Sequence, residues 1–90
     1  MSVTRPPNYD TIEECPYTIS EERQEMLDNN FRYHRPQGDQ QERYPHIRKE
    51  AKKLAETICR LAPVGREQSL ALIKLEEAVM WANASIARNE

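Results

Sequence analysis

The last two thirds of the chain carry two series of apolar residues, spaced three and four positions apart, with a helix breaker between them. The first series is Tyr44, Ile47, Ala51, Leu54, Ile58 and Leu61, and the second is Leu72, Leu75, Val79, Ala82 and Ile86. Residues at these spacings share one face of an α-helix. Pro63 and Gly65 interrupt the pattern, because neither residue continues a helix well. The sequence therefore predicts two helices that fold back on each other as an antiparallel hairpin.

The expected ends of both helices carry specific signals. Asp39 precedes the first helix and Glu42 follows three residues later, which is an aspartate variant of the reciprocal capping box. Pro45 falls in the first turns, where a missing backbone donor costs little. The second helix is expected from Arg66 to about Asn89. At 1.5 Å per residue, each helix would be roughly 33 Å long.

The N-terminal third of the chain has a different character. Three prolines fall within residues 1–19, which show no periodic apolar pattern and are expected to form an extended arm. Ser20 followed by two glutamates has the form of a helix cap with acidic residues in the first turn. A short helix is therefore expected over residues 21–30.

The second long helix has more apolar surface than a two-helix hairpin can cover. The apolar residues outside its main series are Leu70, Ile73, Met80, Trp81, Ala84 and Ala87. A helix that is apolar around most of its circumference is usually buried on more than one side. A chain of 90 residues also buries a modest fraction of its surface by itself. The excess predicts a homo-oligomer, although the arm and the short helix could instead cover part of it.

The predicted fold class is all-α. It consists of an antiparallel two-helix hairpin with a short N-terminal helix and an extended arm, assembled as a homo-oligomer. Residues 1–30 are expected to form the N-terminal arm and short helix. Residues 31–90 are expected to form the helical hairpin that binds the ligand.

The sequence lacks the common signatures of an enzyme, a metal centre and a membrane protein. The GxSxG, HExxH, CxxC and phosphate-loop motifs are absent, and His34 and His46 do not have the i, i+4 spacing of a helical metal pair. No apolar run approaches the roughly 18 residues of a membrane helix, and the N-terminus has no signal-peptide core. Cys15 and Cys59 are expected to be reduced thiols of a cytosolic protein. We therefore expect no catalytic residue, metal, cofactor or membrane partner.

Basic residues are concentrated in the middle third of the chain. Residues 31–60 hold eight basic and four acidic side chains, whereas residues 1–30 hold two basic and seven acidic ones. This imbalance identifies the middle third as the anion-facing region. Within it, Lys49, Lys52 and Lys53 are expected to be merely solvated on the back of the helix.

A loop in this basic region is a candidate for binding a phosphate-bearing ligand. Phe31, Tyr33 and Arg35 combine aromatic rings, which can stack on a base, with a cation for a phosphate. Arg48, in the long helix that follows, can point toward the same region. Pro36 and Gly38 prevent regular secondary structure in this segment. Loops often carry binding groups.

The start of the second long helix is a second candidate site. Arg66 and Ser69 lie beside the unpaired backbone N–H groups of a helix N-terminus, which attract anions. From spacing alone, each candidate at either site, taken singly, is better interpreted as a solvated surface residue.

Two long stretches and two shorter pieces between them resemble a known family. They run from Phe31 to Gln40 (FRYHRPQGDQ) and from Ser69 to Arg88 (SLALIKLEEAVMWANASIAR), with Arg43-Tyr44 and Ile47-Arg48 between. The chain resembles the phage hairpin-domain family, which includes the anti-CBASS cyclic-oligonucleotide sponge and shares its hairpin with an anti-Thoeris sponge. The resemblance covers about residues 30–90 and leaves out the N-terminal arm.

This resemblance implies a hexamer of helical hairpins that acts in the cytoplasm of an infected bacterial host. Such proteins bind cyclic dinucleotides, cyclic trinucleotides or cyclic ADP-ribose variants without cleaving them. Because the messenger is depleted, the effector of the host's immune system stays inactive.

The resemblance also implies roles for individual residues. In the family's dinucleotide pocket, a tyrosine before the long helix stacks on a base and a lysine in that helix meets a phosphate. Tyr33 and Arg48 stand at these positions, and an arginine keeps the charge while adding a planar fork. A separate trinucleotide pocket lies where subunits meet, near the start of the second helix, which makes Arg66 and Ser69 its candidates.

The sequence and the resemblance together predict a phage anti-defence protein that binds and sequesters cyclic oligonucleotide messengers. The alternative is a helical oligomeric adaptor that binds a protein partner. A nucleic-acid polymer is not expected as a partner, because the rest of the chain is acidic and no basic stripe is present.

Overall fold

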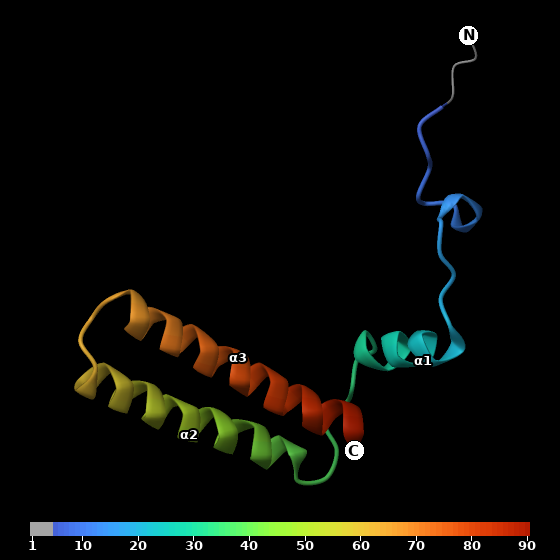
Figure 1. Cartoon of the computed structure of the whole chain (residues 1–90). Coiled ribbons are helices and arrows are strands. Elements are labelled where there is room, and N and C mark those ends of the chain that lie inside the picture. Colours follow the sequence, from blue (N-terminus) through green and yellow to red (C-terminus); the bar gives the residue numbers. More distant parts are fainter. Residues whose placement is uncertain (1–4) are drawn as a thin grey trace. The chain divides into compact units, whose positions relative to one another are not determined.

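The computed structural model describes residues 5–90, which contain helices but no strand. The larger of two compact units spans Tyr33–Glu90. Its two helices, α2 (Gln40–Leu61) and α3 (Arg66–Asn89), lie side by side in opposite directions and are joined by a short turn (Figure 1). At 1.5 Å per residue, they are about 33 and 36 Å long. The predicted all-helical class and the antiparallel hairpin are confirmed.

Helix α3 packs against α2 through the apolar series that its sequence predicts. Every member of that series is half-buried: Leu72, Leu75, Val79, Ala82 and Ile86. A second apolar stripe of α3 does not take part in the hairpin contact. Its large members, Leu70, Ile73, Met80 and Trp81, remain between 40% and 69% exposed.

The predicted apolar series of α2 is correct only in part. Its half-buried members are Tyr44, Ile47, Ala51 and Ile58. Leu54 and Leu61 are 50% and 82% exposed, so their assignment to the hairpin contact is wrong. A straight helix drifts by about 20° per heptad from a seven-residue repeat. Ala55 and Ala62, one residue further along, are half-buried in their place.

The first turn of α2 is capped differently from the prediction. The Asp39 carboxylate makes no cap hydrogen bond and instead pairs with Arg43 at 3.1 Å. The reciprocal bonds join Gln37 and Gln40: the Gln40 N–H donates to the Gln37 carbonyl, and the Gln37 N–H donates to the Gln40 side-chain oxygen, both at 3.0 Å. Gly38 lies between them with φ at 55°, a left-handed conformation that glycine adopts at little cost. The Asp39 cap is therefore replaced by a glycine turn that lets Gln40 reach back.

Two further details shape the ends of the hairpin. Pro45 is the sixth residue of α2, beyond the first turn in which backbone N–H groups have no intrahelical acceptor, so the Gln41 carbonyl lacks its intrahelical donor. At the other end, the Gln68 side chain donates to the Ala62 carbonyl at 2.9 Å. This bond links the last turn of α2 to the first turn of α3.

The smaller unit ends at Arg32 and contains a 3₁₀ turn, η1 (Ile12–Glu14), and helix α1 (Glu21–Asn30). The Ser20 hydroxyl accepts a hydrogen bond from the Arg23 backbone N–H at 3.2 Å, so the predicted start of α1 is confirmed. The 3₁₀ turn interrupts the arm that was expected to be extended.

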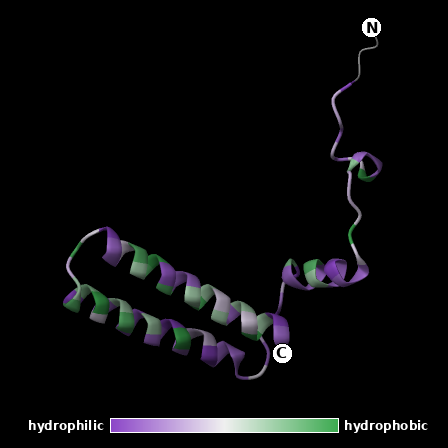
Figure 2. Cartoon of the chain, viewed as in Figure 1, coloured by the Kyte–Doolittle hydropathy of each residue, from purple (hydrophilic) through white to green (hydrophobic). Residues whose placement is uncertain are grey.

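The described residues contain no buried apolar side chain. Gln40, at 6% exposed, is the one residue among them that is buried. The hydropathy colouring shows hydrophobic positions spread around both long helices rather than confined to the contact between them (Figure 2). A single copy of residues 5–90 therefore lacks the closed apolar core that normally stabilises a domain. In this part of the chain, none of the helices has the length and apolarity needed to cross a membrane.

Candidate functional site

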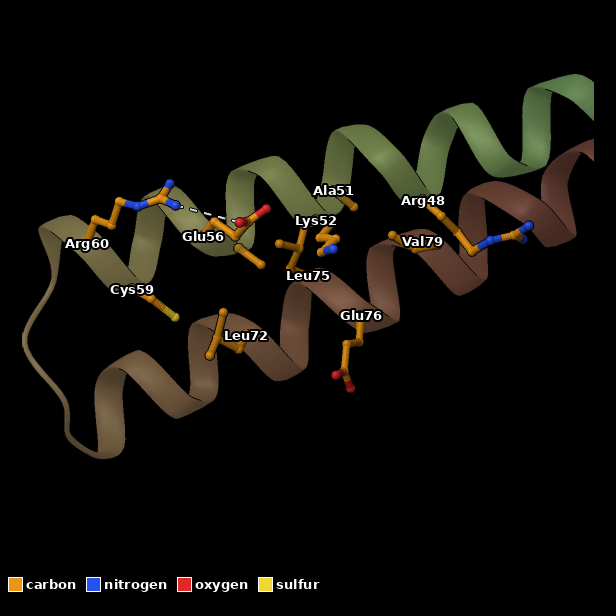
Figure 3. A pocket seen from close by; sticks show the side chains of 11 residues that line it. Arg48, Ala51, Lys52, Glu56, Cys59, Arg60, Leu72, Leu75, Glu76 and Val79 are labelled. Atoms are coloured by element: carbon orange, nitrogen blue, oxygen red, sulfur yellow. Dashed lines mark ion pairs between the residues drawn. The ribbon is translucent and has the colours of Figure 1, made fainter.

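One flank of the hairpin carries a groove of about 660 Å³ between α2 and α3 (Figure 3). Its lining residues are Arg48, Ala51, Lys52, Ala55, Glu56, Cys59, Arg60, Leu72, Leu75, Glu76 and Val79. Aliphatic side chains such as Leu72 and Val79 form an apolar floor. Charged side chains, including Arg48, Lys52 and Glu76, form the rim. A groove of this composition can take a ligand that has both an apolar or flat part and charged groups.

A smaller concavity of about 430 Å³ lies on the same unit. Its lining residues are His34, Tyr44, Arg48, Asn83, Ala84, Ala87 and Arg88. Arg48 borders both concavities, so they meet at its side chain. The second one adds an aromatic ring, an imidazole and an amide to the groups available around that guanidinium.

Arg48 is exposed and has no hydrogen bond or ion pair with any residue between 5 and 90. Lys52, one turn further along α2, has no acidic partner in the same range. Arg60, also on the rim, is instead paired with Glu56 at 3.6 Å (Figure 3). Two neighbouring cations without an ion-pair partner can bind an anion at this part of the groove, while Glu76 supplies a negative charge elsewhere on the rim.

The lysines of α2 differ from one another more than the sequence predicts. Lys53 pairs with Glu50 at 3.1 Å, and this hydrogen bond and charge hold the pKa of Glu50 below its usual value. Lys53 is thus neutralised outside the groove. Lys52 lines the groove, so the expectation that it is merely solvated on the helix back is wrong.

The aromatic and basic residues of the predicted loop site do not line either concavity. Tyr33 is 81% exposed and Phe31 is 85% exposed, and Arg35 is also exposed. Phe31 belongs to the smaller unit, whereas Tyr33 and Arg35 belong to the hairpin unit. The loop residue that does line a concavity is His34, which is half-buried. Tyr33 directly precedes His34 in the sequence, and its exposed ring is free to contact a ligand.

Arg66 and Ser69 both lie exposed in the first turn of α3, and neither lines one of the two concavities. The Ser69 N–H donates to the Gly65 carbonyl at 3.1 Å, which leaves the N–H groups of residues 66–68 without an intrahelical acceptor. Glu67 in the same turn places a negative charge beside them. Any anion at this position must compete with that carboxylate.

Several lining residues were not among the sequence candidates. Asn83 is half-buried in the C-terminal part of α3, and its side-chain oxygen is shielded from solvent without a hydrogen-bond partner in the described structure. Arg88 lies over the Trp81 ring, 5.9 Å from its centroid. The available signal for Asn83 was its position between alanines in a helix interior, where asparagine has poor propensity. For Arg88 and Lys52, nothing in the sequence distinguishes them from other surface cations.

The groups of the site are suited to binding. Among residues 5–90, no cluster of three His, Cys, Asp or Glu side chains could hold a metal ion. The thiols of Cys15 and Cys59 are free. Cys59 is exposed and lines the groove. The dominant chemistry is an unneutralised guanidinium and ammonium above an apolar floor.

Fold and site together define a small helical hairpin domain with an anion-attracting groove. The family model for the Acb2/Tad1 hairpin domain matches residues 24–87, which is more than half of the chain. The protein therefore belongs to the Acb2/Tad1 hairpin-domain family, the family of the anti-CBASS and anti-Thoeris sponges, and the resemblance seen in the sequence is confirmed. Proteins of this family sequester ligands rather than transform them. No curated protein and no solved structure matched the chain.

Proposed function

We propose that this protein binds cyclic oligonucleotide immune messengers and holds them without cleaving them, so that the host effector is not activated. The ligands would be cyclic dinucleotides, cyclic trinucleotides or cyclic ADP-ribose-type molecules, met in the cytoplasm of the infected bacterial host. The observation that carries the proposal is Arg48, which borders both concavities and has no acidic partner among residues 5–90. Family membership supplies the class of ligand.

The charge of the hairpin favours an anionic ligand. Residues 33–90 carry ten basic and eight acidic side chains, whereas residues 5–32 carry three basic and seven acidic ones. A phosphate of the ligand would accept a bidentate hydrogen bond from the Arg48 guanidinium, with Lys52 adding a second charge nearby. The apolar floor beside them offers a surface for a base or ribose.

The remaining candidates take roles around this centre. We assign Tyr33 to stacking on a base, and Phe31 and Arg35 to flanking contacts from the same loop. Arg66 and Ser69 would form part of a second site for trinucleotides at a junction between copies. The ligand-binding domain would be residues 31–90, with residues 1–30 as a separate arm and short helix.

Assembly into a homo-oligomer, with a hexamer as the expected form, is part of the proposal. It is supported by the absence of any buried apolar side chain in residues 5–90 of one copy. The exposed stripe of α3, formed by Leu70, Ile73, Met80 and Trp81, would be covered by a second copy. Covering such surface is the main favourable contribution to association.

Isothermal titration against a panel of cyclic di- and trinucleotides and cyclic ADP-ribose isomers tests the proposal directly. One charge-assisted hydrogen bond contributes about 1.5–3 kcal/mol, so Arg48→Ala should weaken binding by roughly ten- to a hundredfold. Lys53→Ala is the matched control, because Lys53 is a cation of the same helix that is already paired with Glu50. Release of intact ligand by heating separates sequestration from hydrolysis.

Two outcomes would contradict the proposal. If no ligand of the panel gives a heat of binding, the protein is not a cyclic nucleotide sponge. If Arg48→Ala and Lys53→Ala have the same effect, binding does not depend on the unpaired guanidinium.

A second candidate function is a helical oligomeric adaptor that binds a protein partner, and the exposed stripe of α3 favours it. An apolar stripe of this kind can receive an amphipathic helix. In that case Trp81→Ala would abolish function while Tyr33→Ala and Arg48→Ala would leave it unchanged. If the protein is a sponge, Tyr33→Ala and Arg48→Ala should instead impair its function.

A further inference from the structure

A polar cluster joins the two helices at the open end of the hairpin. The Glu90 carboxylate accepts hydrogen bonds from both terminal nitrogens of Arg43, at 2.8 and 2.5 Å, and one from the Gln40 side-chain nitrogen at 3.2 Å. Arg43 also pairs with Asp39 at 3.1 Å. The start of α2 and the end of α3 are thereby tied together where they lie side by side (Figure 1). We refer to Gln40, Arg43 and Glu90 as the end clamp.

Gln40 uses both ends of its amide in this cluster. Its nitrogen donates to Glu90, and its oxygen accepts from the Gln37 backbone N–H at 3.0 Å. It is also the most enclosed side chain of residues 5–90, at 6% exposed. A buried amide that is satisfied on both sides fixes its own orientation, because rotation would break both bonds. The clamp therefore holds the backbone at Gln37 as well as the two helices.

The segment before Gln37 transmits this restraint toward the site. Pro36 fixes its own φ near −65°, and the residue before a proline is confined to extended conformations. Residues 33–37, which we call the ligand loop, are thus restrained over their last three positions, next to the anchor at Gln37. The same loop carries His34, which is half-buried in the wall of the smaller concavity.

We infer that Gln40 is a positioning residue: held by Glu90, which Arg43 binds in turn, it fixes the end of the ligand loop so that His34 stays in the wall of the smaller concavity, beside Arg48. This inference rests on the proposed function for its ligand, but its structural part concerns the protein alone. Loss of the anchor lowers the fraction of molecules with a correctly placed loop, and apparent affinity falls with that fraction.

The test compares a substitution that removes the anchor with a pair of substitutions that restores it. Gln40→Met keeps the length and shape of the side chain but leaves the Gln37 N–H without an acceptor. Gln40→Glu alone would place a carboxylate against that of Glu90, so it is combined with Glu90→Gln, which exchanges donor and acceptor and keeps both hydrogen bonds. The control is Lys53→Met, which removes an exposed ion pair of α2 that has no contact with the loop. Glu90→Ala removes support from the other end of the clamp, should Gln40→Met fail to fold.

Affinity for cyclic di-AMP and hydrogen exchange of the Gln37 amide are the two measurements. One lost hydrogen bond of this kind corresponds to a drop in affinity of roughly tenfold for Gln40→Met, whereas the exchanged pair Gln40→Glu/Glu90→Gln should stay within about twofold of the wild type. The Gln37 amide should exchange faster in Gln40→Met alone. If the clamp only stabilises the fold, its loss would lower the unfolding temperature. Affinity measured well below that temperature would then be unchanged.

The inference is overturned if Gln40→Met binds like the wild type, or if the exchanged pair Gln40→Glu/Glu90→Gln is as weak as Gln40→Met. If the wild type itself binds no cyclic nucleotide, the proposed function fails. Hydrogen exchange of the Gln37 amide then tests separately whether Gln40 anchors the loop. Equal protection of this amide in the wild type and in Gln40→Met would show that it does not.

Discussion

Replacing Trp81 with alanine tests whether the outer stripe of α3 is an interface between copies. Trp81 is 60% exposed in the single chain and lies under the guanidinium of Arg88. A tryptophan side chain can bury up to about 250 Å², and covering its exposed share at about 25 cal/mol per Å² is worth about 4 kcal/mol per copy. Trp81→Ala should therefore weaken association by at least two orders of magnitude per contact while leaving the α2–α3 contact intact.

Sedimentation velocity over a range of protein concentrations is the suitable assay, with thermal unfolding recorded on the same samples. The wild type should sediment as an oligomer, and its unfolding midpoint should rise with concentration, because association stabilises the folded chain. Tyr17→Ala is the matched control, since Tyr17 is an aromatic residue of the smaller unit that is 87% exposed. A wild type that is monomeric at every concentration, or a Trp81→Ala variant that assembles normally, would refute the reasoning.

Two further predictions concern Glu90 and Asn83. Hydrogen bonds from Arg43 and then Gln40 lower the pKa of Glu90 from 4.5 to about 2, so its stabilising contribution is complete above pH 4.5 and is lost as the pH falls toward 2. The difference in unfolding temperature between the wild type and Glu90→Gln should shrink over that interval, and a constant difference would contradict the assignment. Asn83→Ala removes a shielded, unpaired oxygen and improves helix propensity, which should stabilise the fold by about 1 kcal/mol and raise the unfolding temperature by a few degrees. A lower unfolding temperature would mean that the Asn83 amide has a partner in the assembled protein.

The main elements of the fold could be predicted because they depend on local spacing. The 3–4 repeat of α3 placed its buried face correctly from Leu72 to Ile86. The same rule misplaced Leu54 and Leu61, because a seven-residue repeat and a straight helix go out of phase over three heptads. The capping box was also misplaced, since its location depended on the left-handed turn at Gly38 rather than on residue types alone.

The site was less accessible from sequence because it is built from residues distant in the chain. Arg48 was selected from the resemblance and from its charge, and the groove around it depends on which face of α3 meets α2. Lys52, Asn83 and Arg88 enter the site only through that packing. Sequence spacing cannot separate a groove cation such as Lys52 from a neutralised one such as Lys53, because the difference lies in the partner that each finds in space.

The position of Arg48 between two concavities has a consequence for binding stoichiometry. One guanidinium carries five N–H donors but a single positive charge, so two phosphates that contact it from different sides share that charge. Two small anions bound in the two concavities of one hairpin would therefore weaken each other's binding, even without touching. A larger ligand that spans both concavities would use the whole charge alone, so each hairpin would hold one such ligand through this residue.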